Sequence, residues 1–167
     1  MTVYLAHGAS GTATSMTDHV RGLAKRGIDA HAVGLPVSKA ERAVGDYRRQ
    51  VDQLASAIIG GQSYGGRVAS LLAAEETPRG LVLLCYPLHR PGQPDGEARV
   101  SHWPLIHCPV LLLSGEADPF ARLDLLRGAV GQLADAHLLT YPRLGHSLRP
   151  VLDDALDRIA DFVRGLD

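Results

Sequence analysis

Three residues that can together activate a serine hydroxyl lie far apart in this sequence: Ser63, Asp118 and His146. Each follows a short apolar run of the kind that forms a buried strand. A serine hydroxyl is a weak nucleophile, so it needs a base such as His146 to accept its proton. A carboxylate such as Asp118 would hold that imidazole in the correct tautomer and stabilise the imidazolium. The set predicts nucleophilic attack by Ser63 on an acyl carbon.

Ser63 lies in the pattern Gly61-Gln62-Ser63-Tyr64-Gly65-Gly66, after an apolar run at 57–59 and before a helical segment. A strand, a G-x-S-x-G turn and a helix in this order expose the serine Oγ on a sharp, strained turn. Glycines on both sides leave room for that backbone. The helix also directs free N–H groups and the positive end of its dipole at the reacting centre. An incidental serine in a glycine turn is the alternative interpretation.

The acid and the base each have a less specific alternative. Glu116 lies on the same loop as Asp118, and Asp118-Pro119 is also typical of a turn or a helix start. We favour Asp118. His146 is one of eight histidines and can be an ordinary surface residue, but its position after the last strand, in the order Ser, Asp, His, favours the catalytic interpretation.

Two backbone N–H groups are the expected donors to a tetrahedral oxyanion. One is that of Tyr64, directly after the nucleophile, and the other that of Ala9, after the first strand. We expect His7 to shape the loop that carries Ala9, and Ser10 to cap that loop rather than add a hydroxyl to the site. The ring of Tyr64 is expected either to line the pocket or to pack.

The elements that must position these groups alternate along the chain. We expect strands over 2–6, 28–33, 57–59, 81–85, 109–113 and 137–140, and helices over 14–26, 39–54, 64–76, 121–134 and 150–164. In the first helix, Met16, Val20, Leu23 and Ala24 share one apolar face. This alternation predicts one α/β domain over residues 1–167, with a mostly parallel sheet covered on both faces. Catalytic loops then leave the carboxyl ends of the strands.

Residues 86–108 interrupt this rhythm with four prolines and no clear periodicity. We expect a long functional or mobile loop with at most a short helical turn. Trp103, in this loop, would either wall the acyl site or pin the loop to the body. Cys85 and Cys108 are expected to be small core residues in a reducing compartment.

Composition excludes several classes of function. Of 167 residues, 46% are hydrophobic, and the formal net charge is −1, which gives no electrostatic case for nucleic acid or an anionic membrane. The histidines show no metal-ligand spacing. The glycine-rich turn at 61–66, which we call the elbow, lacks the pattern of a phosphate-binding loop. We therefore expect no metal and no cofactor. No apolar run can span a bilayer and no signal peptide is evident, so we expect a cytoplasmic protein.

Four segments together resemble the α/β-hydrolases: His7-Gly8-Ala9-Ser10-Gly11, the elbow at 61–66, Ser114-Gly115-Glu116-Ala117-Asp118-Pro119-Phe120, and Gly145-His146. The chain is similar to small, lidless members related to the dienelactone-hydrolase group. The resemblance implies a three-layer α/β-hydrolase fold with a minimal sheet of about six strands, no cap domain and an open pocket. That group uses a cysteine nucleophile, whereas this chain has Ser63. The family also has two further N-terminal strands, so the side of the sheet at residues 2–6 should be less protected.

We expect a serine hydrolase that cleaves a small ester or thioester through an acyl-enzyme on Ser63. A catalytically weak hydrolase-fold protein that works as a binding or interaction module is the alternative. The expected partner is a small-molecule acyl substrate, with neither nucleic acid nor membrane involved, and the chain would be a monomer or a homodimer.

Overall fold

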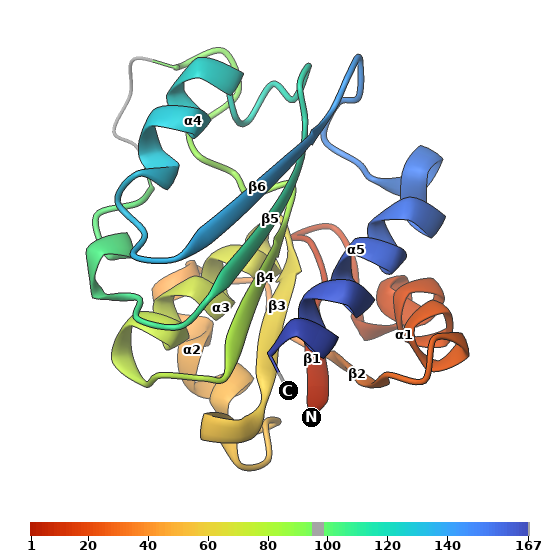
Figure 1. Ribbon diagram of the computed structural model, residues 1–167. Helices are drawn as coiled ribbons and strands as arrows, with labels where there is room; N and C mark the ends of the chain where they lie inside the picture. The colour runs from red at the N-terminus through yellow and green to blue at the C-terminus, as the bar shows by residue number, and fades with distance from the viewer. Residues whose placement is uncertain (95–98, 167) are drawn as a thin grey trace.

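The computed structural model describes residues 1–94 and 99–166 and forms a six-stranded, fully parallel sheet in the order β2-β1-β3-β4-β5-β6 (Figure 1). The strands are β1 (Thr2–Ala6), β2 (Asp29–Val33), β3 (Ile58–Gln62), β4 (Gly80–Leu84), β5 (Val110–Gly115) and β6 (Ala136–Tyr141). The helices are α1 (Thr17–Lys25), α2 (Ala40–Arg48), α3 (Tyr64–Glu75), α4 (Leu123–Val130) and α5 (Leu152–Gly165). Short 3₁₀ turns lie at Ala13–Met16, Leu54–Ser56, Trp103–Leu105 and Arg149–Val151.

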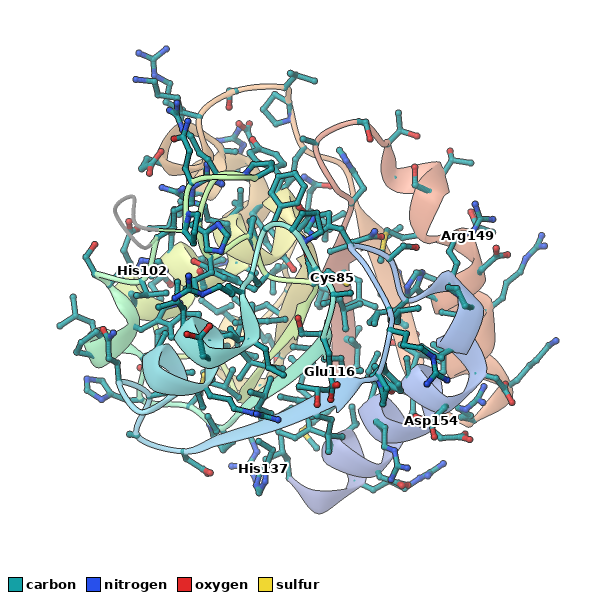
Figure 2. The ribbon with its side chains drawn as sticks, turned by 90° about the horizontal axis from the view of Figure 1, so that it is seen from above. Cys85, His102, Glu116, His137, Arg149 and Asp154 are labelled. Atoms are coloured by element: carbon teal, nitrogen blue, oxygen red, sulfur yellow. The ribbon has the colours of Figure 1, made fainter. Side chains whose placement is uncertain are left out.

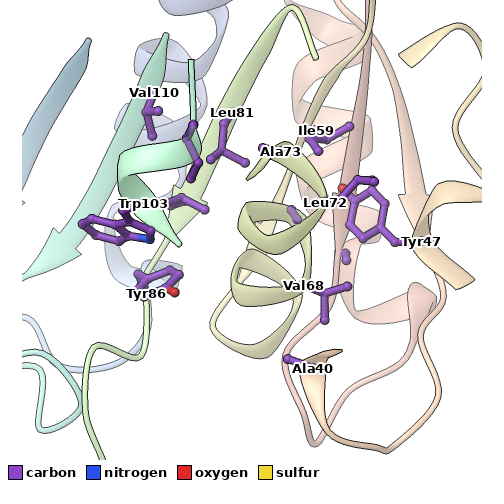
Figure 3. Close-up of a cluster of buried hydrophobic side chains, with 14 of the residues drawn as sticks. Ala40, Tyr47, Ile59, Val68, Leu72, Ala73, Leu81, Tyr86, Trp103 and Val110 are labelled. Carbon is purple, nitrogen blue, oxygen red and sulfur yellow. The ribbon is translucent and has the colours of Figure 1, made fainter. Parts of the chain in front are cut away.

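Helices cover both faces of the sheet, so the molecule has three layers. α2, α3 and α4 lie on one face, and α1 and α5 on the other (Figure 1). Successive side chains of the central strands enter opposite clusters: in β4, Leu81 and Leu83 join the first, and Val82 and Leu84 the second. Figure 3 shows part of the first cluster, where Leu81 faces the helix α3. This double burial is why the strands are near-continuous apolar runs. The predicted three-layer fold is confirmed.

Several helices are shorter than predicted. The helix α1 begins only at Thr17, because the turn before it, Ala13–Met16, is a 3₁₀ turn. The helix expected over 39–54 ends at Arg48, because Gln50 and Val51 donate to carbonyls only three residues back and Gln53 adopts a left-handed backbone with φ 44°. Val51 and Leu54 are still buried, as the apolar stripe predicts. The helix expected over 121–134 is α4, Leu123–Val130, because turns hold its two ends.

The buried face of α1 is also displaced from the predicted one. Ala24, placed on that face by its spacing, is exposed, whereas His19 and Gly22 are buried. A Cβ at Gly22 would lie 2.3 Å from Cδ1 of Leu156. The helix α5 therefore packs so close to α1 that a glycine fits best at this position. The apolar pattern of the sequence did not predict that Gly22 is buried.

The segment after β4 is anchored to the body by aromatic residues. Trp103 is fully buried and packs edge-to-face on Tyr86, with ring centroids 5.0 Å apart (Figure 3). Trp103 therefore pins this segment and does not wall an open site. The single short turn Trp103–Leu105 is the helical turn that was expected. Residues 95–98 of the predicted loop lie outside the described residues.

β2 and β6 form the two edges of the sheet, so β1 is flanked by strands on both sides. At the edge nearer the N-terminus, β2 exposes Asp29 and His31 and buries Ala30 and Val33. The side of the sheet near residues 2–6 therefore ends in a short edge strand that carries polar side chains.

Candidate active site

Ser63 occupies the sharp turn between β3 and α3. Its backbone has φ 50° and ψ −113°, a conformation that L residues rarely adopt. A Cβ added at either Gly61 or Gly65 would lie 2.6 Å from the carbonyl oxygen of Ala6. Both flanking glycines are therefore required by the close packing of the elbow against β1.

His146 links Ser63 to Asp118 by two hydrogen bonds. Its Nδ1–H donates to Oδ2 of Asp118 at 2.7 Å, and the hydroxyl of Ser63 donates to its Nε2 at 2.8 Å. This tautomer is assigned from the network, because a carboxylate can only accept. The unprotonated Nε2 is thus oriented to receive the serine proton. The structure brings together the three side chains that the sequence selected.

Asp118, and not Glu116, is the carboxylate paired with His146. The side chain of Asp118 is fully buried, and its second oxygen, Oδ1, accepts the N–H of Phe120 at 2.8 Å. Glu116 instead accepts the hydroxyl of Thr140 at 2.8 Å. Because Asp118 is buried and both of its oxygens are engaged, it is held rigidly against the imidazole.

The loop after β1 is held by the ring of His7. The N–H of Leu35 donates to Nε2 of His7 at 3.0 Å, so the ring proton is on Nδ1, which donates to the carbonyl of Gly8 at 2.7 Å. The N–H of Gly11 donates to the same carbonyl at 3.0 Å. In a trans peptide the N–H points away from the carbonyl, so these bonds also fix the direction of the Ala9 N–H. His7 therefore shapes this loop.

The same loop lies beside the nucleophile. A Cβ on Gly8 would be 3.9 Å from Cβ of Ser63, and Tyr64 is the first residue of α3, whose N–H has no acceptor within the helix. The N–H groups of Ala9 and Tyr64 therefore belong to segments that adjoin Ser63. The ring of Tyr64 packs against the core, and its hydroxyl donates to the carbonyl of Pro36 at 3.0 Å. Ser10 is exposed.

A second serine–histidine pair, Ser70 and His102, lies elsewhere. Ser70 Oγ donates to the carbonyl of Arg67 at 2.8 Å and is 2.8 Å from Nε2 of His102. Ser70 is fully buried, and among the described residues no carboxylate pairs with His102. Burial lowers the pKa of His102 to about 4. In Figure 2, His102 and Arg149 lie on opposite sides of Cys85, so this pair is remote from the segment that follows His146.

This second pair lacks three features of the first. It has no strained elbow, because Ser70 is inside α3; it has no acid partner among the described residues; and it is not accessible to a substrate. Ser70 and His102 instead join α3 to the segment before Trp103.

The sequence interpretation gave no functional role to two residues, Phe120 and His89, that contact His146 or the loop that carries Asp118. The ring of Phe120 stacks on the imidazole of His146, with centroids 4.2 Å apart and planes at 27°. His89 is buried and hydrogen bonded to the loop that carries Asp118. The position of Phe120, two residues after Asp118, was the one feature of the sequence that could have indicated its contact with His146.

A hollow of about 340 Å³ lies beside the acid loop. It is lined by His89, Gly92, Pro94, Glu116, Ala117, Asp118, Pro119, Arg122 and Leu123. Neither Ser63 nor His146 is among these residues, so the hollow adjoins the acid rather than the nucleophile.

Cys85 and Cys108 are buried free thiols, and burial raises the pKa of each to about 12. Within residues 1–94 and 99–166, no three metal-ligating side chains come together. In the same part of the chain, none of the helices is long and apolar enough to cross a membrane.

The fold and the elbow define a hydrolase of the α/β class, and comparison with known proteins agrees. The chain belongs to the alpha/beta hydrolase family, because the family model described as an alpha/beta hydrolase domain matches residues 1–162.

Solved structures show the same fold at low sequence identity. A monoacylglycerol lipase of Paleococcus ferrophilus is 14% identical with a TM-score of 0.85, covering 99% of this chain and 95% of its own. An alpha-beta serine hydrolase homologue from Coxiella burnetii is 15% identical with a TM-score of 0.77, and the match covers 97% of this chain and 84% of the homologue. A predicted CIB-like hydrolase from Thermoplasma acidophilum is 18% identical with a TM-score of 0.75, and the match covers 98% of this chain and 86% of that hydrolase.

Proposed function

We propose that this protein is a serine hydrolase that cleaves a small carboxylic ester or thioester through an acyl-enzyme on Ser63. The observation that carries the proposal is the continuous hydrogen-bonded chain from Ser63 through His146 to Asp118, built on a strained elbow. The buried pair of Asp118 with His146 and the loop fixed by His7 support it. Neighbouring structures that include a lipase and a serine hydrolase homologue are consistent with this chemistry.

In the proposed reaction, Ser63 Oγ attacks the acyl carbon while Nε2 of His146 takes its proton. The negative charge moves to the carbonyl oxygen, which the N–H groups of Ala9 and Tyr64 stabilise. The imidazolium, held by Asp118, then gives the proton to the leaving alkoxide or thiolate. Water attacks the acyl-enzyme with His146 as base again, which releases the acid and restores Ser63. Each cycle consumes one ester and one water.

Labelling with a fluorophosphonate probe, together with hydrolysis of short p-nitrophenyl esters, tests the proposal. Wild type should react and Ser63→Ala should not. Ser70→Ala is the matched control, since it removes the hydroxyl of the second serine–histidine pair and should retain labelling. Equal labelling of wild type and Ser63→Ala would refute the assignment. A folded wild type that neither labels nor turns over any ester would favour the binding-module alternative.

We further propose small, accessible acyl groups as substrates, since no cap domain covers the elbow in the described part of the chain. A series of p-nitrophenyl esters of increasing acyl length should show the highest kcat/KM for short chains. A preference for long chains would contradict this. The free buried thiols support a reducing compartment, for which we propose the cytoplasm. We propose that the protein is a monomer or a homodimer, and light scattering of the pure protein measures the mass that distinguishes the two. We also propose that it acts without nucleic acid or a membrane.

A further inference from the structure

The imidazole of His146 is held on its face as well as on its edge. Asp118 accepts its Nδ1–H at 2.7 Å, and the ring of Phe120 lies against its plane at a centroid distance of 4.2 Å. A histidine ring turns freely about its last torsion unless contacts restrict it, because that torsion has broad wells. The hydrogen bonds to Asp118 and Ser63 hold the edge of the ring, and the stacked neighbour restricts its plane.

The acid and the stacked ring belong to one tight loop. Oδ1 of Asp118 accepts the N–H of Phe120 at 2.8 Å, while the carbonyl of Asp118 accepts the N–H of Ala121 at 3.2 Å. The start of the loop is tied to the loop before His146, since Ala117 donates to the carbonyl of Leu144 at 2.9 Å. The end of the loop needs an anchor of its own, because α4 begins only at Leu123.

His89 supplies that anchor from the segment after β4. Its backbone N–H donates to the carbonyl of Phe120 at 3.0 Å, and its Nε2 accepts the N–H of Arg122 at 3.0 Å. Since Nε2 accepts, the proton is on Nδ1, which donates to the carbonyl of Arg90 at 2.8 Å. His89 is 3% exposed. One buried residue therefore fixes the backbone on both sides of Ala121: its own N–H holds the carbonyl of Phe120, and its side chain holds the N–H of Arg122.

We propose that His89 is a positioning residue for the catalytic histidine: it anchors the loop that carries Phe120 and Asp118, and Phe120 sets the plane of the His146 ring. The inference rests on the proposed function. The stack also favours the imidazolium that forms during attack, because an aromatic face attracts a cation. The alternative is a purely structural role, in which the hydrogen bonds of the buried His89 contribute to folding alone.

Variants at His89 separate the two interpretations. His89→Leu removes the ring acceptor, and His89→Gln keeps an acceptor at a similar reach. His107→Leu makes the same change at an exposed histidine and is the control. We expect His89→Leu to lower kcat by about 10- to 100-fold with KM changed less than about two-fold, because small misplacements of catalytic groups cost rate. His89→Gln should recover most of kcat, and His107→Leu should match wild type.

Variants at Phe120 test the stack directly. Phe120→Leu should lower kcat by about five- to ten-fold, while Phe120→Tyr, which keeps the ring, should not. Phe162→Leu is the control, because Phe162 is the other phenylalanine and lies on α5. These variants also keep the proposal testable if His89→Leu does not fold.

A spectroscopic readout reports on the ring without turnover. The far-downfield proton resonance of His146 Nδ1–H, bonded to Asp118, should broaden in His89→Leu and Phe120→Leu and stay sharp in His89→Gln and Phe120→Tyr. A folded His89→Leu with wild-type kcat and a sharp resonance would overturn the proposal, as would equal losses in His89→Gln and His89→Leu. If wild type does not label at Ser63, the proposed function fails, but the resonances still decide whether His89 positions the ring.

Discussion

The hydroxyl of Tyr47 is hydrogen bonded to Gly60 in both directions: it receives the N–H of Gly60 at 2.9 Å and lies 2.7 Å from its carbonyl oxygen. It also lies 2.8 Å from the carbonyl of Tyr4. Tyr47 is on α2 and fully buried, while Gly60 precedes the nucleophile by three residues on β3. A helix on one face of the sheet thus satisfies backbone groups directly below the elbow.

Tyr47→Phe should therefore destabilise the protein, although it replaces none of the residues Ser63, Asp118 and His146. Loss of the hydroxyl removes its hydrogen bonds to buried backbone groups of Gly60, which costs about 1–3 kcal/mol in unfolding free energy. Burial raises the pKa of Tyr47, so the hydroxyl remains a neutral donor across the working pH range. Urea unfolding measures the change. A variant as stable as wild type would show that water replaces the hydroxyl.

Members of the Ser63–His146–Asp118 set should respond unequally to substitution. Ser63→Ala and His146→Ala should each lower kcat on the order of 10⁶-fold, because the two act as one unit. Asp118→Asn should cost on the order of 10⁴-fold, since it disturbs the tautomer of His146 but leaves nucleophile and base in place. Steady-state kinetics on one p-nitrophenyl ester measure all three. Glu116→Gln is the control for Asp118, because Glu116 bonds Thr140 rather than the imidazole, and it should retain activity.

Glycines in the elbow and in a helix should respond in opposite ways to alanine. In Gly65→Ala the new Cβ would lie 2.6 Å from the carbonyl oxygens of Ala6 and His7, so backbone must move and we expect lost activity with a lower Tm. Gly128 lies within α4 and has no atom within 4 Å of such a Cβ. Gly128→Ala should raise the unfolding free energy by about 0.5–1 kcal/mol. If Gly65→Ala keeps full activity, the proposed tightness of the elbow is wrong.

Buried histidines should make the protein less stable in mild acid. Burial lowers the pKa of His102 from 6.5 to about 4, and burial also lowers that of His19. Between pH about 6.5 and about 4 the unfolded chain binds protons that the folded chain does not, so stability is complete above this window and declines as pH falls through it.

His102→Gln should reduce this loss. Between about pH 7 and about pH 4.5, the fall in unfolding free energy should be smaller by about 1 kcal/mol, after allowing for the partial exposure of the ring. His107→Gln, at an exposed position, is the control and should show the wild-type fall. Urea unfolding at the two pH values measures both. An unchanged fall in His102→Gln would mean that other groups carry the acid sensitivity.

The sequence by itself determined the layered fold and the segments of the site. Continuous apolar runs specify strands buried on both faces, and the glycines around Ser63 specify the elbow, because these are local requirements of backbone and burial. Order along the chain was enough to select Ser63, Asp118 and His146 as the candidates. The face that each central strand residue presents also follows from its two-residue period.

Only the tertiary structure decided which loop side chains meet. Asp118 contacts His146, whereas Glu116, the alternative on the same loop, accepts the hydroxyl of Thr140. His89 reaches the acid loop from a strand away, and Phe120 covers the imidazole, through contacts that no local pattern encodes. The same holds for Gly22, which is buried because α5 comes close. Periodicity determines which face an element buries, whereas the direction of a loop side chain depends on partners distant in the sequence.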